Sequence, residues 1–178
     1  MPVYIILFRG VGGVTQLPTA PLRAKLTEAG FENVSTYINS GNAVVKSKLG
    51  RQRVIETIAG ICRQHFAFEK AIYAPTTAEW ERLIHNNPFA DAVEPGNLLH
   101  AALLEADPAK EKLDALQALC AHGDRLAVVE TVAYIHTPNG FSKSQMGAKF
   151  DKGIGVANTA RNWNTVLKLR DLAKKAGG

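Results

Sequence analysis

Three polar segments of this 178-residue chain carry side chains suited to binding a charged ligand. The first, "FRGVGGVTQLP" (8–18), contains Arg9, Gly10, Gly12 and Gly13. Glycines let a backbone approach a ligand and turn N–H groups toward an anion, and an arginine adds a two-pronged donor. The spacing matches neither GxxxxGK[ST] nor GxGxxG. Because a tight turn with positive φ also requires glycines, an anion site and a plain strand-to-helix turn both remain open.

The second segment, "YINSGN" (37–42), places Asn39, Ser40 and Asn42 around a Ser-Gly centre. Hydroxyl and amide groups can hydrogen-bond a ligand, but Asn, Ser and Gly are also the residues that tight turns prefer. Two short β-type runs flank the pair, which predicts a hairpin with these side chains at its tip.

The third segment is "NTARNWNT" (158–165), which precedes a helical pattern. We expect Thr159 to cap this helix and Trp163 to pack in the core with the apolar stripe that follows. An arginine in the first turn opposes the helix dipole and therefore calls for an anion, either a carboxylate or a ligand. The candidate ligand-binding side chains here are Arg161, Asn162 and Asn164.

No residue pattern identifies a reaction. Ser40 has no evident His–Asp partnership, and the sequence lacks GxSxG. The five histidines are scattered without HExxH, and Cys62 and Cys120 form no CxxC pair. We therefore expect no metal and no cofactor, and we favour a non-enzymatic protein. An enzyme acting on a phosphorylated or nucleotide substrate is one alternative, and polar segments with purely structural roles are another.

Positive charge is concentrated near the C-terminus. The net charge is +5, and residues 141–178 hold eight Lys or Arg against two acids. This basic segment makes an anionic small molecule or a nucleic acid a plausible partner, with a solvated helix face as the alternative. The sequence points to no particular protein partner.

The order of elements predicts an α+β fold. A strand at 3–8 that is apolar at every position should be buried on both faces. The elements that follow are a helix that Thr19 can cap, a hairpin of 33–38 and 42–47, a helix through 53–66 and a strand at 70–74. This is the βαββαβ order of a ferredoxin-like unit. That topology places the first loop and the hairpin tip at the same end of the sheet.

The second half repeats this order in part. A capping box at Thr76 to Glu79 begins a helix, a strand follows at 97–105, and Asp107 should cap the next helix. A second hairpin then precedes a helical tail, which stands where the last strand would be. We expect two ferredoxin-like subdomains with antiparallel or mixed sheets, residues 1–75 and 76–178, packed tightly together because no linker separates them.

The composition is that of a globular protein, with 46% hydrophobic and 21% charged residues. The longest early apolar run, "VYIILF", is far shorter than the roughly 20 residues of a membrane helix, and no leader pattern precedes it. We expect a cytoplasmic protein without membrane contact.

Four blocks of sequence, in order, resemble a bacterial family catalogued as domain of unknown function 1697: "YIILFRGVGG", "LRAKLTEAGFENVSTYINSGNAVV", "NNPF" and "ANTARNWNTVLKL". The resemblance implies two ferredoxin-like subdomains and no known activity. Family members often have a longer first loop, RGINVGG followed by basic residues. Its shorter form here weakens an anion-binding role for that loop.

Overall fold

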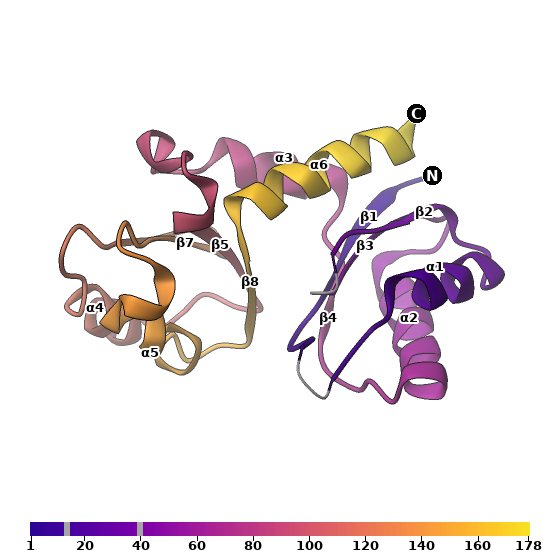
Figure 1. Cartoon of the computed structure of the whole chain (residues 1–178), viewed down its shortest axis with the longest axis horizontal. Helices are drawn as coiled ribbons and strands as arrows, with labels where there is room; N and C mark the ends of the chain where they lie inside the picture. The colour runs from indigo at the N-terminus through magenta and orange to yellow at the C-terminus, as the bar shows by residue number, and fades with distance from the viewer. Residues whose placement is uncertain (13–14, 39–40) are drawn as a thin grey trace. The chain divides into compact units, whose positions relative to one another are not determined.

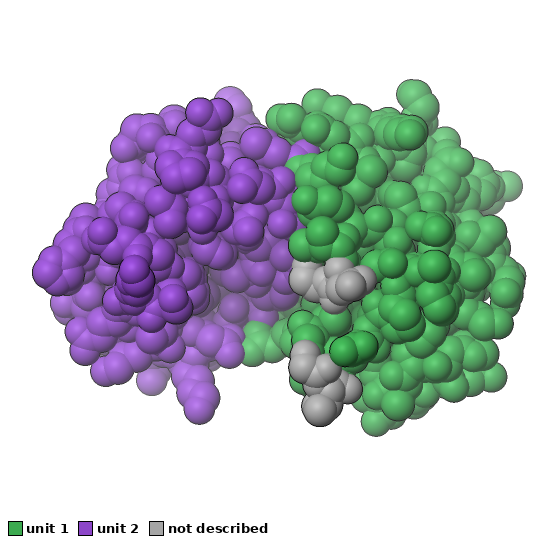
Figure 2. Space-filling model, in the orientation of Figure 1, with its two compact units in different colours: residues 1–82, 168–178 green, residues 83–167 purple. Residues whose placement is uncertain are grey.

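The computed structural model describes residues 1–12, 15–38 and 41–178. The chain forms two compact units (Figure 2). Unit 1 contains residues 1–82 and 168–178, and unit 2 contains residues 83–167. The C-terminal residues thus group with the N-terminal half of the chain, whereas the sequence predicted a division into 1–75 and 76–178.

Unit 1 contains a four-stranded antiparallel sheet with the strand order β2-β3-β1-β4 (Figure 1). Its elements are β1 Val3–Phe8, α1 Thr19–Glu28, β2 Glu32–Thr36, β3 Asn42–Lys46, α2 Arg51–Phe66 and β4 Ile72–Tyr73. This confirms the predicted ferredoxin-like order, with β3 between β1 and β2.

Strand β1 is buried on both faces, as its sequence predicted. Tyr4, Ile6 and Phe8 belong to a core cluster with side chains of α1 and α2, such as Leu22 and Ile58. The alternate residues of β1, from Val3 to Leu7, are also at most 8% exposed. A strand that loses water on both sides contributes more hydrophobic stabilisation than an edge strand can.

Helix α3, Thr77–His85, begins at the predicted capping box. The backbone N–H of Thr76 donates to Glu79 Oε2 at 2.8 Å, and the N–H of Glu79 donates to Thr76 Oγ1 at 3.3 Å. Two helix starts differ from the prediction: α1 has Pro18 at its N-cap, and α4, Lys110–Gln117, has Ala109. Neither cap residue makes a side-chain hydrogen bond, so these helices begin without the caps expected at Thr19 and Asp107.

Unit 2 contains a second antiparallel sheet with the order β6-β7-β5-β8, which is the arrangement of unit 1 repeated. Its strands are β5 Leu99–Leu104, β6 Arg125–Val129, β7 Val132–His136 and β8 Asn158–Asn162. Helix α4 follows β5, and helix α5, Gln145–Gly153, precedes β8. Short 3-10 helices lie at Ala90–Ala92, Gly96–Leu98 and Phe141–Lys143. The core between this sheet and α4 and α5 includes Ala102, Leu116, Ile135 and Phe150.

The prediction that a helical tail replaces the last strand is wrong, because the chain forms strand β8 before helix α6, Trp163–Gly177. Strand β8 pairs with β5 over five residues, from Asn158 opposite Leu104 to Asn162 opposite His100. The segment "NTARN" has no β-branched or apolar run, so its strand conformation depends on the hydrogen bonds of β5 rather than on local preference. The second half therefore has the complete βαββαβ order.

Helix α6, Trp163–Gly177, contains residues of both units. Its last turn is held within unit 1 by two side chains: Asn33 Nδ2 donates to the carbonyl of Ala176 at 2.8 Å, and Lys46 Nζ donates to that of Gly177 at 3.3 Å. Donors of this kind satisfy the carbonyls that a helix C-terminus leaves unpaired. Among the described residues, no helix is long and apolar enough to cross a bilayer.

Candidate anion-binding site

The loop after β1 and the turn before β3 meet at one end of the sheet of unit 1, as predicted. The N–H of Phe8 donates to the carbonyl of Gly41 at 2.9 Å. A Cβ on Gly41 would lie 2.6 Å from Val11 Cγ2, and its φ is +81°. Glycine is therefore required at this position, both by the backbone conformation and by the close approach of the first loop.

In the described part of the first loop, three backbone N–H groups donate to backbone carbonyls. The N–H of Gly12 donates to the carbonyl of Thr15 at 2.6 Å, and the reverse bond is 3.0 Å. The N–H of Arg9 donates to the carbonyl of Ala71. Gly10 and Gly12 have φ values of +67° and +144°. These features are those of the strand-to-helix turn, and among the described loop residues they leave the N–H groups of Arg9, Gly12 and Thr15 unavailable to cradle a phosphate.

Lys70, which the sequence analysis did not single out, lies over this loop. Its Nζ donates to the carbonyl of Gly10 at 3.3 Å. Because an ammonium has three donors, two remain after this bond, the only one that a described residue makes with it. The sequence contains a signal for this position. In a ferredoxin-like sheet the last strand, β4, lies beside β1. Lys70 precedes β4 and therefore lies next to the end of β1.

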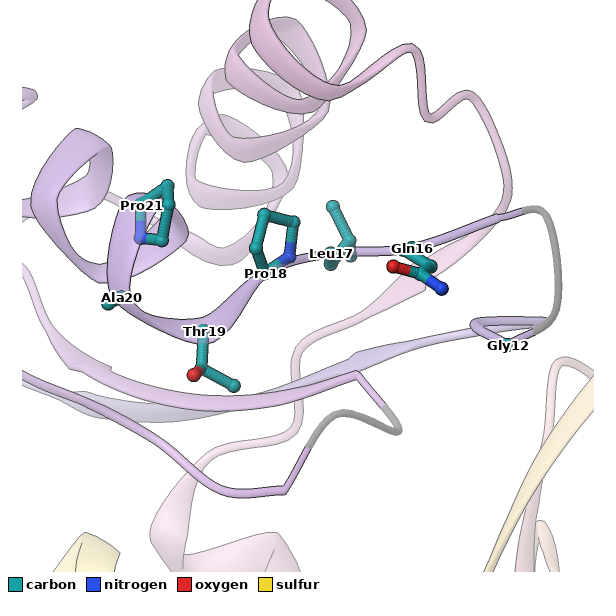
Figure 3. Close-up of a pocket in the computed structure, with 7 residues that line it drawn as sticks. All are labelled: Gly12, Gln16, Leu17, Pro18, Thr19, Ala20 and Pro21. Atoms are coloured by element: carbon teal, nitrogen blue, oxygen red, sulfur yellow. The ribbon is translucent and has the colours of Figure 1, made fainter.

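A surface groove of about 400 Å³ runs beside the same loop (Figure 3). Figure 3 shows the lining at Gly12 and along residues 16–21, which lead into the first turn of α1. The lining residues are Gly12, Gln16, Leu17, Pro18, Thr19, Ala20 and Pro21. The groove extends from the loop to the first turn of α1.

Of the predicted residues in the second segment, Asn42 is described. It is the first residue of β3, only 1% exposed, and its Nδ2 donates to the carbonyl of Tyr37 at 3.2 Å. This bond closes the hairpin and accounts for an asparagine here by turn geometry. Gly13, Asn39 and Ser40 lie outside the described residues.

Arg161 lies on strand β8 of unit 2 and not in the first turn of a helix. Arg161 therefore does not oppose a helix dipole, and the prediction that it does is wrong. Its Nη1 donates to Thr159 Oγ1 and to the carbonyl of Ala160, both at 2.8 Å. Burial lowers the pKa of the Arg161 guanidinium to about 10, so the group stays protonated at neutral pH.

The rest of this segment begins α6. Asn162, not Thr159, is the cap, since its Oδ1 accepts from the N–H of Thr165 at 3.0 Å. Trp163 is 3% exposed, which confirms the prediction that it packs in the core. Asn164 is exposed and lies directly against Gly96, where a Cβ would collide with its side chain.

The basic C-terminal segment does not form one continuous charged element. Residues 141–167 belong to unit 2 and residues 168–178 to unit 1. Lys174 Nζ lies 3.1 Å from Glu81 Oε1, and Arg170 Nη2 lies 3.0 Å from Asp171 Oδ1. Neighbouring acids thus offset part of the charge that the sequence suggested for a partner.

The fold is a repeated ferredoxin-like α+β arrangement with a polar, cationic loop cluster at one end of the sheet of unit 1. Among the residues that the structure describes, no arrangement of side chains is diagnostic of a reaction. The profile of the family described as "Protein of unknown function (DUF1697)" matches residues 1–134. The chain belongs to this family. The match contains the first two polar segments and ends before the third, residues 158–165.

Among curated proteins, none matches the chain. A solved structure, that of the conserved bacterial protein SP0830 from Streptococcus pneumoniae, superposes with a TM-score of 0.76 at 22% identity. The alignment covers 97% of this chain and 98% of that one. At this level of identity the likeness establishes the shared fold along nearly the whole chain.

Proposed function

We propose that this protein is a non-enzymatic binding protein for an anionic ligand, a nucleotide or a nucleic acid, held at the loop end of the sheet in unit 1. One observation carries the proposal: Lys70 lies on the carbonyl of Gly10, the residue next to Arg9, so that two cationic side chains occur at the same sheet end. Charge-assisted hydrogen bonds to phosphate are among the stronger polar interactions in proteins.

In this proposal the side chains bind the anion. The N–H groups of Arg9 and Gly12 already donate to backbone carbonyls, so Arg9 and Lys70 supply the donors. The turn at Gly41 and Asn42 adjoins them through the bond between Phe8 and Gly41. Ser40 is a further proposed contact, to be tested by its own variant.

Calorimetric titration of the full chain tests the proposal. The probes are a panel of nucleoside mono-, di- and triphosphates and short single- and double-stranded oligonucleotides, each at about 50 mM and about 200 mM salt. We expect binding that weakens with salt. Loss of a charge-assisted hydrogen bond in Lys70→Ala or Arg9→Ala should reduce affinity about tenfold or more.

Lys48→Ala is the matched control. Lys48 is an exposed lysine of unit 1 that follows β3, at the opposite end of that strand from Asn42. Its removal changes the net charge by the same amount as Lys70→Ala but should leave affinity within about twofold at moderate salt. The length of β3, roughly 15 Å for five residues, separates Lys48 from the site, and salt screens charges beyond about 10 Å. The proposal is wrong if no probe binds, or if Lys70→Ala and Lys48→Ala behave alike.

A further inference from the structure

The two faces of the sheet in unit 2 contact different parts of the chain. Leu126 of β6 and Ile135 of β7 belong to the core with side chains of α4 and α5. Their neighbours Arg125 and His136 lie on the other face, because side chains alternate along a strand. Residues 86–92, which contain the block "NNPF", contact that other face and belong to the same unit.

Arg125 connects this segment to the sheet. Its Nη1 and Nη2 donate to Oδ1 and Oδ2 of Asp91 at 3.1 and 2.9 Å, as a two-pronged ion pair. Its Cζ lies 4.6 Å from the centroid of the Phe89 ring, within the range of a cation–π contact. One guanidinium therefore holds two side chains of the segment.

His136 holds the same guanidinium from the neighbouring strand. It lies directly opposite Arg125 in the register of β6 and β7. Its Nδ1 is 3.3 Å from Nε and 3.1 Å from Nη2 of Arg125. Because a guanidinium can only donate hydrogen bonds, Nδ1 accepts them, and the ring is neutral with its proton on Nε2.

Two carboxylates also lie near this ring. Asp91 is held by both prongs of Arg125, and Asp124, the residue before β6, accepts a hydrogen bond from Ser144 Oγ at 2.7 Å. Burial and Arg125 lower the pKa of His136, the two carboxylates raise it, and the lowering prevails. The ring is therefore neutral at neutral pH and takes up a proton below pH 6.5.

The groups beside His136 in its own strand and in β5 carry no charge. Tyr134 lies on the same face, two residues earlier, and its hydroxyl donates to the carbonyl of Leu83. Burial raises the pKa of Tyr134, so it stays neutral. The residue opposite His136 in β5 is Leu99, which is apolar. Protonation of the ring therefore places a positive charge beside Arg125.

We propose that His136 is a proton-sensitive latch for residues 86–92. Once Nδ1 carries a proton it cannot accept from Arg125, and two positive groups then face each other at contact distance. The arginine side chain moves away from the ring, and Phe89 and Asp91, which depend on its position, lose their place on the sheet. Mild acid thus loosens the segment, and neutral pH restores it.

Amide hydrogen exchange of the full chain, followed by NMR between about pH 7.5 and 5, tests the latch. The reporters are the N–H of Phe89, which donates to Asn87 Oδ1 at 2.9 Å, and the N–H of Ala92, which donates to the carbonyl of Phe89 at 2.9 Å. After correction for the intrinsic pH dependence of exchange, both should lose protection as His136 titrates. The loss should be about tenfold for each unit by which the closed segment lowers the pKa of His136.

The amides of β7 serve as the internal reference for this measurement. They should keep their protection while the segment loses its own, because the latch opens locally. The proposal is overturned if Phe89 and Ala92 keep their protection through the titration of His136. An equal loss in β7 would also overturn it, because the sheet itself would then be opening.

His136→Asn should abolish the pH dependence of the two reporters. An asparagine amide oxygen accepts hydrogen bonds as Nδ1 does but does not titrate. His122→Asn is the matched control: His122 is exposed in the turn before β6, and its φ of +54° suits asparagine. This control should behave as the wild type. A pH dependence that persists in His136→Asn contradicts the proposal.

The titration of the His136 ring provides a measurement that does not depend on the His136 variant. Arg125→Met removes the guanidinium and keeps an unbranched side chain beside Phe89. The pKa of His136 should rise in this variant, because a neighbouring positive charge is gone, and it should fall in Asp91→Asn, because a negative charge is gone. An unchanged pKa in Arg125→Met would show that the ring and the guanidinium are not coupled, and the latch would be excluded.

Discussion

Oδ1 of Asn162 accepts a hydrogen bond from the N–H of Thr165 at 3.0 Å, so the last residue of β8 is also the cap of α6. One asparagine thus ends a strand and begins a helix within the segment "RNWNT". Together with buried Trp163 and with Asn164 against Gly96, this gives three of the five residues a structural role. Arg161 neither caps the helix nor packs as an apolar core residue, so these roles do not explain its charge.

Asn162→Ala should lower the free energy of unfolding by about 1 kcal/mol, within the 0.5–2 kcal/mol typical of a lost N-cap. Asn162→Ser should keep most of the stability, because a serine hydroxyl can accept the same bond. Urea unfolding of the three proteins measures this. An alanine variant as stable as the serine variant would mean that the cap contributes nothing. Unchanged ligand affinity in Asn162→Ala would separate the cap from the proposed site.

Gly41→Ala should destabilise unit 1 by about 1–3 kcal/mol, because alanine at φ +81° is strained and its Cβ would approach Phe8 Cβ to 2.9 Å. Gly50→Ala is the control, since a Cβ at Gly50 meets nothing within 4 Å and its φ is −69°. Thermal unfolding of both variants tests the packing between the first loop and the hairpin. Equal midpoints for the two variants would contradict the close approach seen at Gly41.

Leu169→Ala should lower stability by about 2–4 kcal/mol, as is usual for truncating a fully buried leucine. Leu169 is 0% exposed and belongs to the part of α6 that groups with unit 1. Leu172→Ala, at a partly exposed position of the same helix, should cost clearly less. Hydrogen exchange should show the loss of protection in β1 and β3. Protection lost in β5 and β7 alone would contradict the assignment of residues 168–178 to unit 1.

The stability of the protein should fall as the pH drops from about 6.5 toward 4. Burial lowers the pKa of His100 from 6.5 to about 4, and burial and Arg125 lower the pKa of His136. The unfolded chain therefore binds protons at a higher pH than the folded chain does. The stability from these neutral rings is complete above the unfolded pKa and is lost as the pH falls toward the folded pKa.

For His100 the loss is at most about 3.5 kcal/mol, which is 2.5 pKa units at about 1.4 kcal/mol each. Urea unfolding at a series of pH values measures it. His100→Phe should flatten the curve between pH 6.5 and 4, whereas His85→Gln, at an exposed position, should not. A curve for His100→Phe that parallels the wild type would show that His100 is not protected from protonation.

The sequence alone was sufficient for the features that depend on local preferences and on burial pattern. The uninterrupted apolar run of β1 predicted a strand covered on both faces, and Thr76 with Glu79 predicted the start of α3. The βαββαβ order of the first half followed from element spacing, and it placed the first loop beside the hairpin turn. Each of these signals lies within a few residues or follows from the fixed handedness and order of a small motif.

The tertiary structure decided what depends on distant partners. "NTARN" becomes β8 because β5 supplies its hydrogen bonds, and this moves Arg161 from a helix to a strand and the cap from Thr159 to Asn162. Lys70 reaches the carbonyl of Gly10, 60 residues away in the chain. Strand pairing and burial are non-local, so a polar segment with weak intrinsic preference takes the conformation that its neighbours impose. The sequence determined which residues are polar and where the strong elements lie; only folding decided which of those residues meet.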